Sequence, residues 1–333
     1  MDYSAAMRRC LELADRGRGA VGNGALVGSV LLRRGAIVAE GFHAAWGRAH
    51  AERALLEAFS SDVEPEDVLV VNLEPCCHHG KTPPCIDILL QRGVRRVVVG
   101  MADPDPRVAG KGIALLRSAG VAVEGPVLPE LCYRANRGFV SVRTTGRPWI
   151  TLKRAQTPDG RVANPDGSPL KITSSAQDVW AHTRLRATHD AILIGVGTAL
   201  CDDPSLNTRF AQLLPQENAP IQPWRIVLDR ELRLPPTAKL ATDAHRARTI
   251  VVHAPEASAD RASALAAAGA RLLALPAPGG SYDLRVLCDA LLQPDGDYHG
   301  LTSILVEGGP KTWQSFKDAG LVDEEVILMG NPQ

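Results

Sequence analysis

Three side chains that bind zinc well occur in two short segments of the first half of the chain. His50 and Glu52 are separated by one residue, Cys76 follows Pro75, and Cys85 comes nine residues after Cys76. Catalytic zinc sites use three protein ligands, commonly thiolates and imidazoles, and leave a fourth position to water. A glutamate two residues after the histidine would reach that water, take its proton, and return it to a ring nitrogen and to departing ammonia. This pattern favours hydrolytic deamination.

The same segment also allows a purely structural zinc site. A closed site needs a fourth protein ligand, and Cys77, His78 and His79 each offer one. Adjacent residues usually point apart, so we expect Cys77 to be a packing residue. A structural site has no use for a carboxylate beside the metal. Glu52 therefore distinguishes an enzyme from a non-catalytic, zinc-stabilised binding module.

The elements around these residues are those of a three-layer α/β domain. The proposed ligands stand at the starts of two of its helices and after one of its buried strands, positions that converge at one edge of an open sheet. Apolar spacing and turn residues predict helices over 3–14, 50–59, 83–90, 110–119 and 129–140, and strands over 26–32, 36–42, 68–73, 94–99 and near 121.

A second α/β domain is predicted after a boundary near Gly146, which divides the chain into 1–146 and 147–333. A strand over 303–306 leads through Gly308-Gly309-Pro310 into a helix, whose free N–H groups suit a cofactor phosphate. No cluster of metal-ligand residues is apparent in this half. The predicted strands are 149–153, 191–194, 225–229, 249–253, 271–275 and 303–306, and the helices are 174–187, 259–268, 282–292 and 311–319.

Length and composition agree with two globular domains and exclude several classes of protein. The 333 residues carry 37 basic and 37 acidic side chains, and only 4% are aromatic, which disfavours a nucleic-acid partner. An apolar run of about 20 residues, as a membrane span requires, is missing, and no signal peptide is visible, so we expect a cytoplasmic protein. Its seven cysteines are then reduced, and Cys201 is expected to be a buried apolar thiol.

The stretch from Glu74 to Cys85 resembles the bifunctional riboflavin-biosynthesis deaminase/reductase family, as do Lys153-Arg154-Ala155 and Glu307-Gly308-Gly309-Pro310 in the second half. Nucleoside and nucleic-acid deaminases have their two cysteines only two residues apart, so the wide spacing is the specific part. The resemblance implies a cytidine-deaminase-like domain followed by a dihydrofolate-reductase-like domain. We further expect a homo-oligomer.

The resemblance implies a small-molecule substrate, 2,5-diamino-6-(5-phosphoribosylamino)pyrimidin-4-one. The first domain would deaminate this pyrimidine ribosyl phosphate, and the second would use NADPH to reduce the ribosyl to a ribityl chain. In the first domain, the implied residues are His50, Cys76 and Cys85 for Zn²⁺, Glu52 for proton transfer, and Asn23, His43, His78 and Lys81 for substrate. In the second, they are Ala155, Thr198, Asp202, Gly309, Pro310, Lys311, Thr312, Trp313, Gln314 and Ser315 for NADPH, and Arg186, Leu206, Arg209 and Glu307 for substrate.

The chain departs from the family pattern in both halves. Gly24 replaces a usual proline and is expected to loosen the loop that holds Asn23. Lys171 replaces a tryptophan that normally lies against the cofactor, so weaker NADPH binding is expected. Pro169 and Arg230 each replace a serine, and the chain ends at Gln333 where relatives continue through further strands.

These departures leave two further alternatives. One is a monofunctional deaminase with an inactive reductase-like domain. The other is a zinc deaminase of another nucleoside or nucleotide, against which the neutral net charge and the wide cysteine spacing argue.

Overall fold

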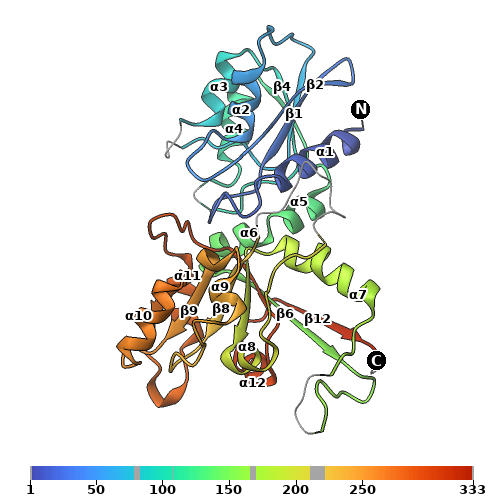
Figure 1. Ribbon diagram of the computed structural model, residues 1–333. Coiled ribbons are helices and arrows are strands. Elements are labelled where there is room, and N and C mark those ends of the chain that lie inside the picture. Colours follow the sequence, from blue (N-terminus) through green and yellow to red (C-terminus); the bar gives the residue numbers. More distant parts are fainter. Residues whose placement is uncertain (1, 79–82, 107, 166–169, 211–221, 332–333) are drawn as a thin grey trace. The chain divides into compact units, whose positions relative to one another are not determined.

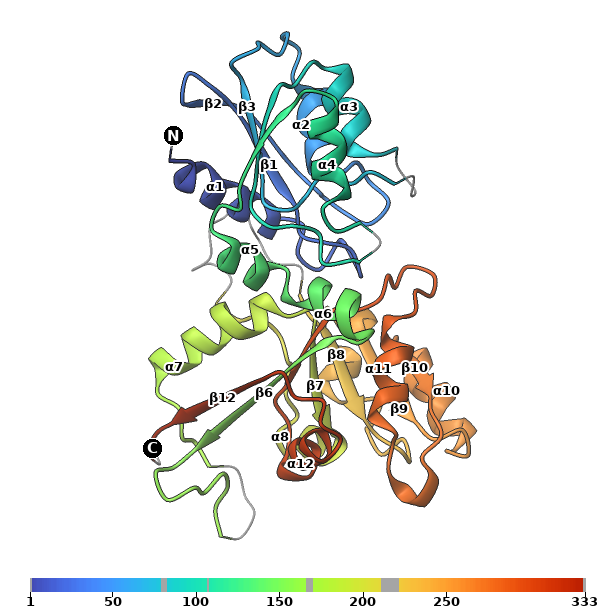
Figure 2. The same ribbon diagram turned by 180° about the vertical axis from the view of Figure 1, so that it is seen from behind.

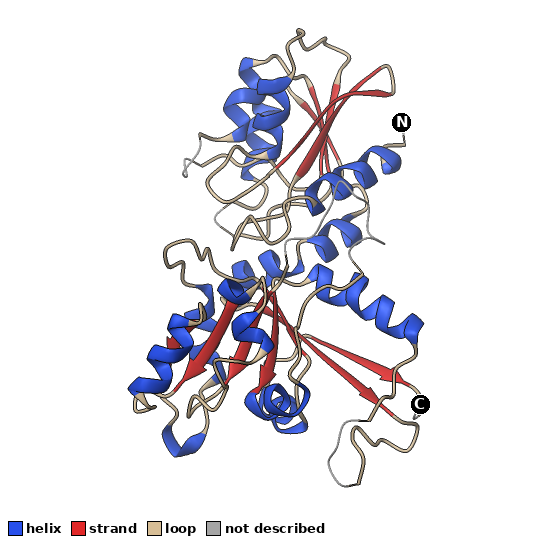
Figure 3. Cartoon of the chain, viewed as in Figure 1, coloured by secondary structure: helices blue, strands red, loops and turns tan. Residues whose placement is uncertain are grey.

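The computed structural model describes residues 2–78, 83–106, 108–165, 170–210 and 222–331 (Figure 1). Contacts within the chain divide it into two compact units. The first comprises Met1–Gly146 with Asp295–His299, and the second comprises Arg147–Pro294 with Gly300–Gln333. Each unit is built on its own sheet, and each is described separately below (Figure 3).

The first unit contains a five-stranded mixed sheet. Strand β1 pairs antiparallel with β2 and with β3, whereas β3, β4 and β5 run parallel. The hairpin turn between β1 and β2 places Arg34 and Gly35 at positive φ. The order is β2-β1-β3-β4-β5, with strands β1 (Gly28–Arg33), β2 (Ala36–Phe42), β3 (Val68–Val71), β4 (Arg96–Val99) and β5 (Ala122–Glu124).

Helices cover both faces of this sheet, which confirms the predicted three layers (Figures 1 and 2). Alternate residues along each strand pack into two different hydrophobic cores, one on each face of the sheet, because successive side chains point to opposite faces. Val30 and Val70 pack with the helices of one face, and Leu31 and Leu69 pack with those of the other. The first face carries α1 (Ser4–Asp15), α5 (Pro129–Ala135) and α6 (Arg137–Thr145), and the second carries α2 (Ala51–Ala58), α3 (Cys85–Gln91) and α4 (Lys111–Ser118).

The predicted helical stretch 129–140 is helical except at Asn136, which separates α5 from α6. The buried Asn136 amide accepts a hydrogen bond from the Leu26 N–H at 2.8 Å and donates to the Leu26 carbonyl at 2.9 Å. An asparagine that bonds to backbone in this way favours a helix boundary over a helix interior.

The second unit contains a seven-stranded sheet in which every pair is parallel. Strand β12, which was not predicted, pairs with β6 from Thr151 to Gln156. The order is β10-β9-β8-β7-β11-β6-β12, with strands β6 (Trp149–Gln156), β7 (Ala191–Gly195), β8 (Trp224–Leu228), β9 (Thr249–His253), β10 (Arg271–Ala274), β11 (Ser303–Val306) and β12 (Glu324–Met329).

The helix predicted over 174–187 is irregular. After α7 (Ser175–Trp180) the chain continues as a π-helical turn over Ala181–Leu185 and a 3₁₀ turn over Arg186–Thr188. Among the described helices, none is both long and apolar enough to cross a membrane. The remaining helices of this unit are α8 (Val196–Asp202), α9 (Lys239–Thr242), α10 (Ala259–Ala267), α11 (Leu284–Leu292) and α12 (Pro310–Asp318).

Candidate active sites in the two units

The three predicted zinc ligands converge in the first unit. His50 immediately precedes α2, Cys85 is the first residue of α3, and Cys76 lies in the segment that follows β3. The His50 Nδ1 atom lies 3.5 Å from the Cys76 Sγ and 3.4 Å from the Cys85 Sγ. The backbone N–H of Cys85 donates to the Cys76 Sγ at 3.3 Å, which ties the second cysteine to the first.

These separations fit a tetrahedral zinc ion. With Zn–N near 2.0–2.1 Å and Zn–S near 2.3 Å, a tetrahedral angle places nitrogen and sulfur about 3.5 Å apart. A hydrogen bond with Cys85, and then one with His50, lower the pKa of the Cys76 thiol to about 4, which favours the thiolate that zinc binds. Both the donor set and its spacing are those of a zinc site.

The described part of the chain offers three ligands in this group and no fourth. Cys77 packs against the hydrophobic core under α2, α3 and α4, as expected of a packing residue. His78 is exposed, and His79 lies outside the described residues. Three ligands leave one tetrahedral position to water, which is the arrangement of a catalytic site.

Glu52 is buried beside these ligands. It lies in the first turn of α2, and its side chain forms a hydrogen bond with the Cys85 thiol. Burial raises the pKa of Glu52, and the negative charge of Cys76 raises it further. A carboxyl group in this position can exchange protons with a ligand bound at the metal.

Of the predicted deaminase substrate contacts, His43 lies next to His50 and Asn23 lies in a described loop of the same unit. The buried His43 bonds through Nδ1 to the Ala49 carbonyl at 3.1 Å, and its ring meets the His50 ring edge-on at 5.3 Å. Asn23 is held through its backbone N–H, which donates to the His299 carbonyl at 3.0 Å. Lys81 lies outside the described residues.

Glu74 is a residue of this site whose role the sequence did not reveal. Its buried carboxylate accepts backbone N–H groups of Asp103, Gly110 and Ile113 at 3.0, 2.9 and 3.1 Å. It thereby fixes the loop after β4 and the start of α4 next to the segment that carries Cys76. The only signal in the sequence was its place at the head of the cysteine motif.

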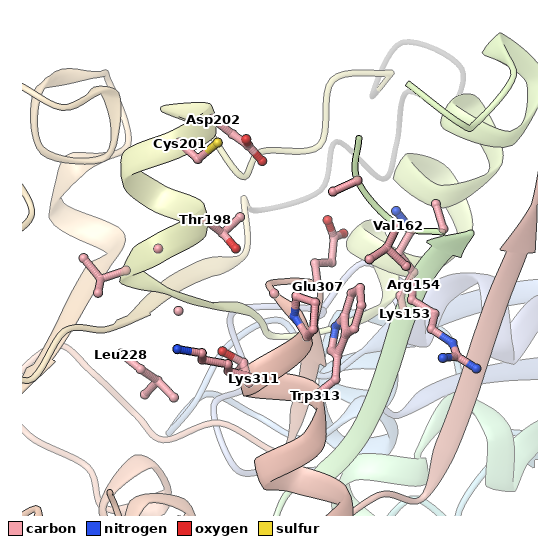
Figure 4. A pocket seen from close by; sticks show the side chains of 18 of the residues that line it. Lys153, Arg154, Val162, Thr198, Cys201, Asp202, Leu228, Glu307, Lys311 and Trp313 are labelled. Carbon is pink, nitrogen blue, oxygen red and sulfur yellow. The ribbon is translucent and has the colours of Figure 1, made fainter. Parts of the chain in front are cut away.

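The second unit contains a cleft of about 1050 Å³ (Figure 4). Residues at or just after the carboxyl ends of β6, β7, β8 and β11 line it. In open parallel sheets, ligands bind beyond the carboxyl ends of strands where the strand order reverses, and β11 returns between β7 and β6 at such a point. The lining includes Lys153, Ala155, Val162, Ile172, Gly195, Thr198, Cys201, Asp202, Leu228, Arg230, Tyr282, Glu307, Gly309, Lys311, Thr312 and Trp313.

Glycines bring two turns of this cleft close together. A Cβ on Gly195 would lie 2.7 Å from the Thr312 Oγ1, and one on Gly309 would lie 3.3 Å from the Thr198 Oγ1. Gly309 has φ of +62° and is followed by Pro310 as the first residue of α12. Free N–H groups at a helix start lined by glycines suit a phosphate. The cleft therefore fits a nucleotide cofactor.

Most predicted cofactor residues line the cleft, and two do not. Ala155, Thr198, Asp202 and the run 309–313 are part of the lining. Gln314 and Ser315 instead bond within α12, to the Asp318 carboxylate at 2.7 Å and the Lys311 carbonyl at 2.9 Å. Successive helical residues point in different directions, so a helix contributes only one face to a cleft.

Cys201 differs from expectation, and Lys171 has an ion-pair partner on α7. Cys201 is exposed and lines the cleft, so the prediction of a buried thiol is wrong (Figure 4). It lies on the last turn of α8, a helix that the sequence did not predict. Lys171 is exposed, forms an ion pair with Asp178 and donates to the Thr173 hydroxyl at 3.3 Å. The charge of Lys171 is thus paired with that of Asp178, and neither residue is among those that line the cleft.

Arg186 and Glu307 form a bidentate pair, of which Glu307 lines the cleft (Figure 4). The Arg186 Nε and Nη2 donate to the two carboxylate oxygens at 2.8 and 2.7 Å. Burial alone would raise the pKa of Glu307, but the charge and hydrogen bonds of Arg186 outweigh burial and hold the pKa at about 2. Glu307 is therefore ionised at neutral pH and fixed in one orientation.

The other two predicted substrate residues lie in the loop that follows α8. Leu206 is buried in the core with φ of +45°, and Arg209 contacts His182. His182, on the π-helical turn, was not singled out from the sequence. A regular helical pattern carries no sign of such a turn.

Comparisons with known proteins agree with both units. The family model "Cytidine and deoxycytidylate deaminase zinc-binding region" matches residues 1–101, and the model "RibD C-terminal domain" matches residues 148–332. The riboflavin biosynthesis protein RibD of Aquifex aeolicus is 37% identical over 97% of this chain and 85% of its own length. That of Escherichia coli is 37% identical over 97% of this chain and 86% of its own.

Solved structures of similar chains cover both units. RibD of Acinetobacter baumannii superposes with a TM-score of 0.81 at 32% identity, covering 99% of this chain and 86% of that one. A diaminohydroxyphosphoribosylaminopyrimidine deaminase/5-amino-6-(5-phosphoribosylamino)uracil reductase from Thermotoga maritima gives 0.76 at 33% identity, covering 95% and 83%. These matches confirm a cytidine-deaminase-like first domain and a reductase second domain. The chain belongs to the RibD family of riboflavin-biosynthesis enzymes.

Proposed function

We propose that this enzyme performs two consecutive steps of riboflavin biosynthesis on a pyrimidine ribosyl phosphate. The first unit deaminates 2,5-diamino-6-(5-phosphoribosylamino)pyrimidin-4-one, and the second reduces the ribosyl group of the deaminated product with NADPH. The observation that carries the deaminase assignment is the convergence of His50, Cys76 and Cys85 beside the buried Glu52.

In the first unit, His50, Cys76 and Cys85 would hold zinc. Bound zinc supplies an activated water at the open position. Glu52 would accept a proton from that water and deliver it to the ring nitrogen next to the amino-bearing carbon, while the water oxygen forms a bond to that carbon. Glu52 would then move the remaining proton of the added hydroxyl to the amine. The carbon–nitrogen bond breaks, a carbonyl forms, and ammonia leaves. The burial of Glu52 keeps these protons from exchanging with bulk water.

In the second unit, Thr198 and the start of α12 would hold the phosphates of NADPH, and Ala155 would lie along its length. Bound NADPH would supply the hydride that the anomeric carbon of the sugar takes up as its bond to the ring oxygen breaks, and a proton from water would complete the hydroxyl of the ribityl chain. The ionised Glu307, fixed by Arg186, would accept a hydrogen bond from a sugar hydroxyl at the edge of the cleft. A cleft volume at the upper end of the usual range of about 300–1000 Å³ suits a cofactor together with a substrate.

The substitution Glu52→Gln tests the deaminase assignment. The variant should retain zinc, because Glu52 is not a ligand, and should lose about 10²–10⁴-fold in ammonia release, because the proton carrier is gone. Metal content and single-turnover ammonia release measure the two effects. Glu57→Gln, at an exposed position of the same helix, is the matched control and should behave as the parent. Deamination by Glu52→Gln at the parental rate would contradict the assignment.

NADPH oxidation tests the reductase assignment. With the deaminated substrate supplied directly, the full chain should oxidise one NADPH for each ribosyl group reduced. Calorimetric NADPH binding without oxidation would instead favour a deaminase with an inactive reductase-like domain.

A further inference from the structure

A charged cluster around the Arg186–Glu307 pair contains one buried imidazole to which nothing above assigns a role. His182 is 3% exposed and lies on the π-helical turn Ala181–Leu185. Isolated π turns are frequent at functional sites, because they change which side chains a helix presents. Here the same irregular helix presents both His182 and Arg186 to the loop 206–209.

Both ring nitrogens of His182 face Arg209. The Arg209 backbone nitrogen lies 3.0 Å from Nδ1, and its guanidinium lies with Nε at 3.3 Å and Nη2 at 3.1 Å from the His182 Nε2. A neutral imidazole accepts at one nitrogen only, so the ring accepts either the backbone N–H or the guanidinium of Arg209. The Phe210 ring packs edge-on against the imidazole at 5.3 Å. Arg186 holds the same loop from the other side, donating to the Asn207 carbonyl at 3.0 Å. The loop is thus fixed by two neighbouring side chains of one helix.

The contact between His182 and Arg209 requires a neutral imidazole. Arginine can only donate, so the ring must accept, and a doubly protonated ring accepts at neither nitrogen. Burial, followed by the charges of Arg186 and Arg209, lowers the pKa of His182 to about 4, while Glu307 and Asp178 act in the opposite direction. At neutral pH the ring is therefore an uncharged hydrogen-bond acceptor, and it does not neutralise the positive charge of Arg209.

Within the described residues, the donors of Arg209 that do not face His182 have no protein partner and can bind an anion. A guanidinium has five N–H donors, and His182 takes only its Nε and Nη2 edge. Arg209 is exposed, in contrast to the buried His182. An arginine whose side chain is already fixed before a ligand binds loses less conformational freedom on binding. The planar fork of its guanidinium also matches the oxygens of a phosphate.

We propose that His182 is a positioning residue of the second unit, whose imidazole holds Arg209 beside the Arg186–Glu307 pair to form a binding site for the phosphate ester of a sugar phosphate. This inference rests on the proposed reductase function and adds to it a residue that need not touch the substrate. The geometry requires an acceptor of the size of an imidazole at position 182.

Two variants of the full chain separate the acceptor from packing. His182→Phe keeps a ring against Phe210 but removes the acceptor, whereas His182→Gln keeps an acceptor. Calorimetric titration with ribose 5-phosphate should show binding about tenfold weaker for His182→Phe and within about threefold of the parent for His182→Gln. Ribose without the phosphate should bind all three proteins alike. NADPH affinity and ammonia release should stay unchanged in both variants and report that each unit is folded.

A double-mutant cycle with Arg209→Ala tests the mechanism independently of any change in stability. Once Arg209 is removed, His182→Phe should weaken ribose 5-phosphate binding no further. Equal affinity of the parent and His182→Phe would overturn the proposal, as would equal losses in the Phe and Gln variants. If the parent binds NADPH but not ribose 5-phosphate, the substrate assignment of the second unit fails, and the role of His182 fails with it.

Discussion

At the scale of single residues, burial of His182 among arginines makes the stability of the second unit depend on pH. Its pKa is near 6.5 when unfolded and about 4 when folded, so between these values the unfolded chain binds a proton that the folded chain does not. Stability from this residue is therefore lost as pH falls. From pH 7 to pH 5 the loss should be about 2 kcal/mol of unfolding free energy.

Urea denaturation of the parent and of His182→Phe at both pH values measures this effect. The fall in unfolding free energy should be smaller in the variant by about that amount. Glu307 does not contribute to this difference. Its pKa is about 2 in the folded chain against 4.5 ordinarily, so the stability that it provides is lost mainly as the pH falls from 4.5 to 2. Equal falls in both proteins would show that His182 is not buried as a neutral ring.

The residues of the zinc site could be predicted because each carries its own signal. A histidine, a glutamate two positions later and two cysteines near strand and helix ends indicate a metal and its proton carrier without knowledge of the fold. Glu74 and His182 carry no such signal. Their roles depend on backbone N–H groups and an arginine that only the folded chain brings within hydrogen-bonding distance.

At the scale of elements, the start of α12 should be sensitive to a single methyl group. Gly309→Ala would place a Cβ 3.3 Å from the Thr198 Oγ1 at φ of +62°, where a side chain is strained by about 1–2 kcal/mol. Because this turn points into the cleft, NADPH binding should weaken about tenfold, as measured by calorimetry.

The matched control lies after the end of the same helix. Gly320 has φ of +64° with nothing near its Cβ position, so Gly320→Ala carries the same backbone strain away from the cleft. It should lower stability while leaving NADPH affinity unchanged. If the two variants lose affinity equally, the start of α12 does not bind the cofactor.

Elements with strong periodicity were predicted well, and elements defined by context were not. The buried strands β3, β4, β7 and β11 consist mostly of apolar residues and lie within two residues of their predicted bounds. Strand β12 has two acidic residues followed by four apolar ones at the edge of the sheet, without alternation of residue type, and becomes a strand by pairing with β6. The short α8 follows β7 directly, with Gly195 before its first residue, so its sequence resembles a turn.

At the scale of the whole molecule, the zinc site and the cleft are each built on a separate hydrophobic core. The zinc ligands belong to elements packed around the five-stranded sheet, and the cleft belongs to the seven-stranded sheet. Each sheet has its own buried strands and helices, so each site is held by the packing of its own unit. Loss of one site should therefore leave the other intact.

Removal of zinc from the full chain tests this separation. Dialysis against a chelator should abolish ammonia release and, because structural and catalytic metals stabilise the fold that binds them, lower the unfolding temperature of the first unit. NADPH affinity, and NADPH oxidation with the deaminated substrate supplied, should remain at the parental values. Added Zn²⁺ should restore deamination. A parallel loss of NADPH binding on chelation would show instead that the second unit depends on the metal centre of the first.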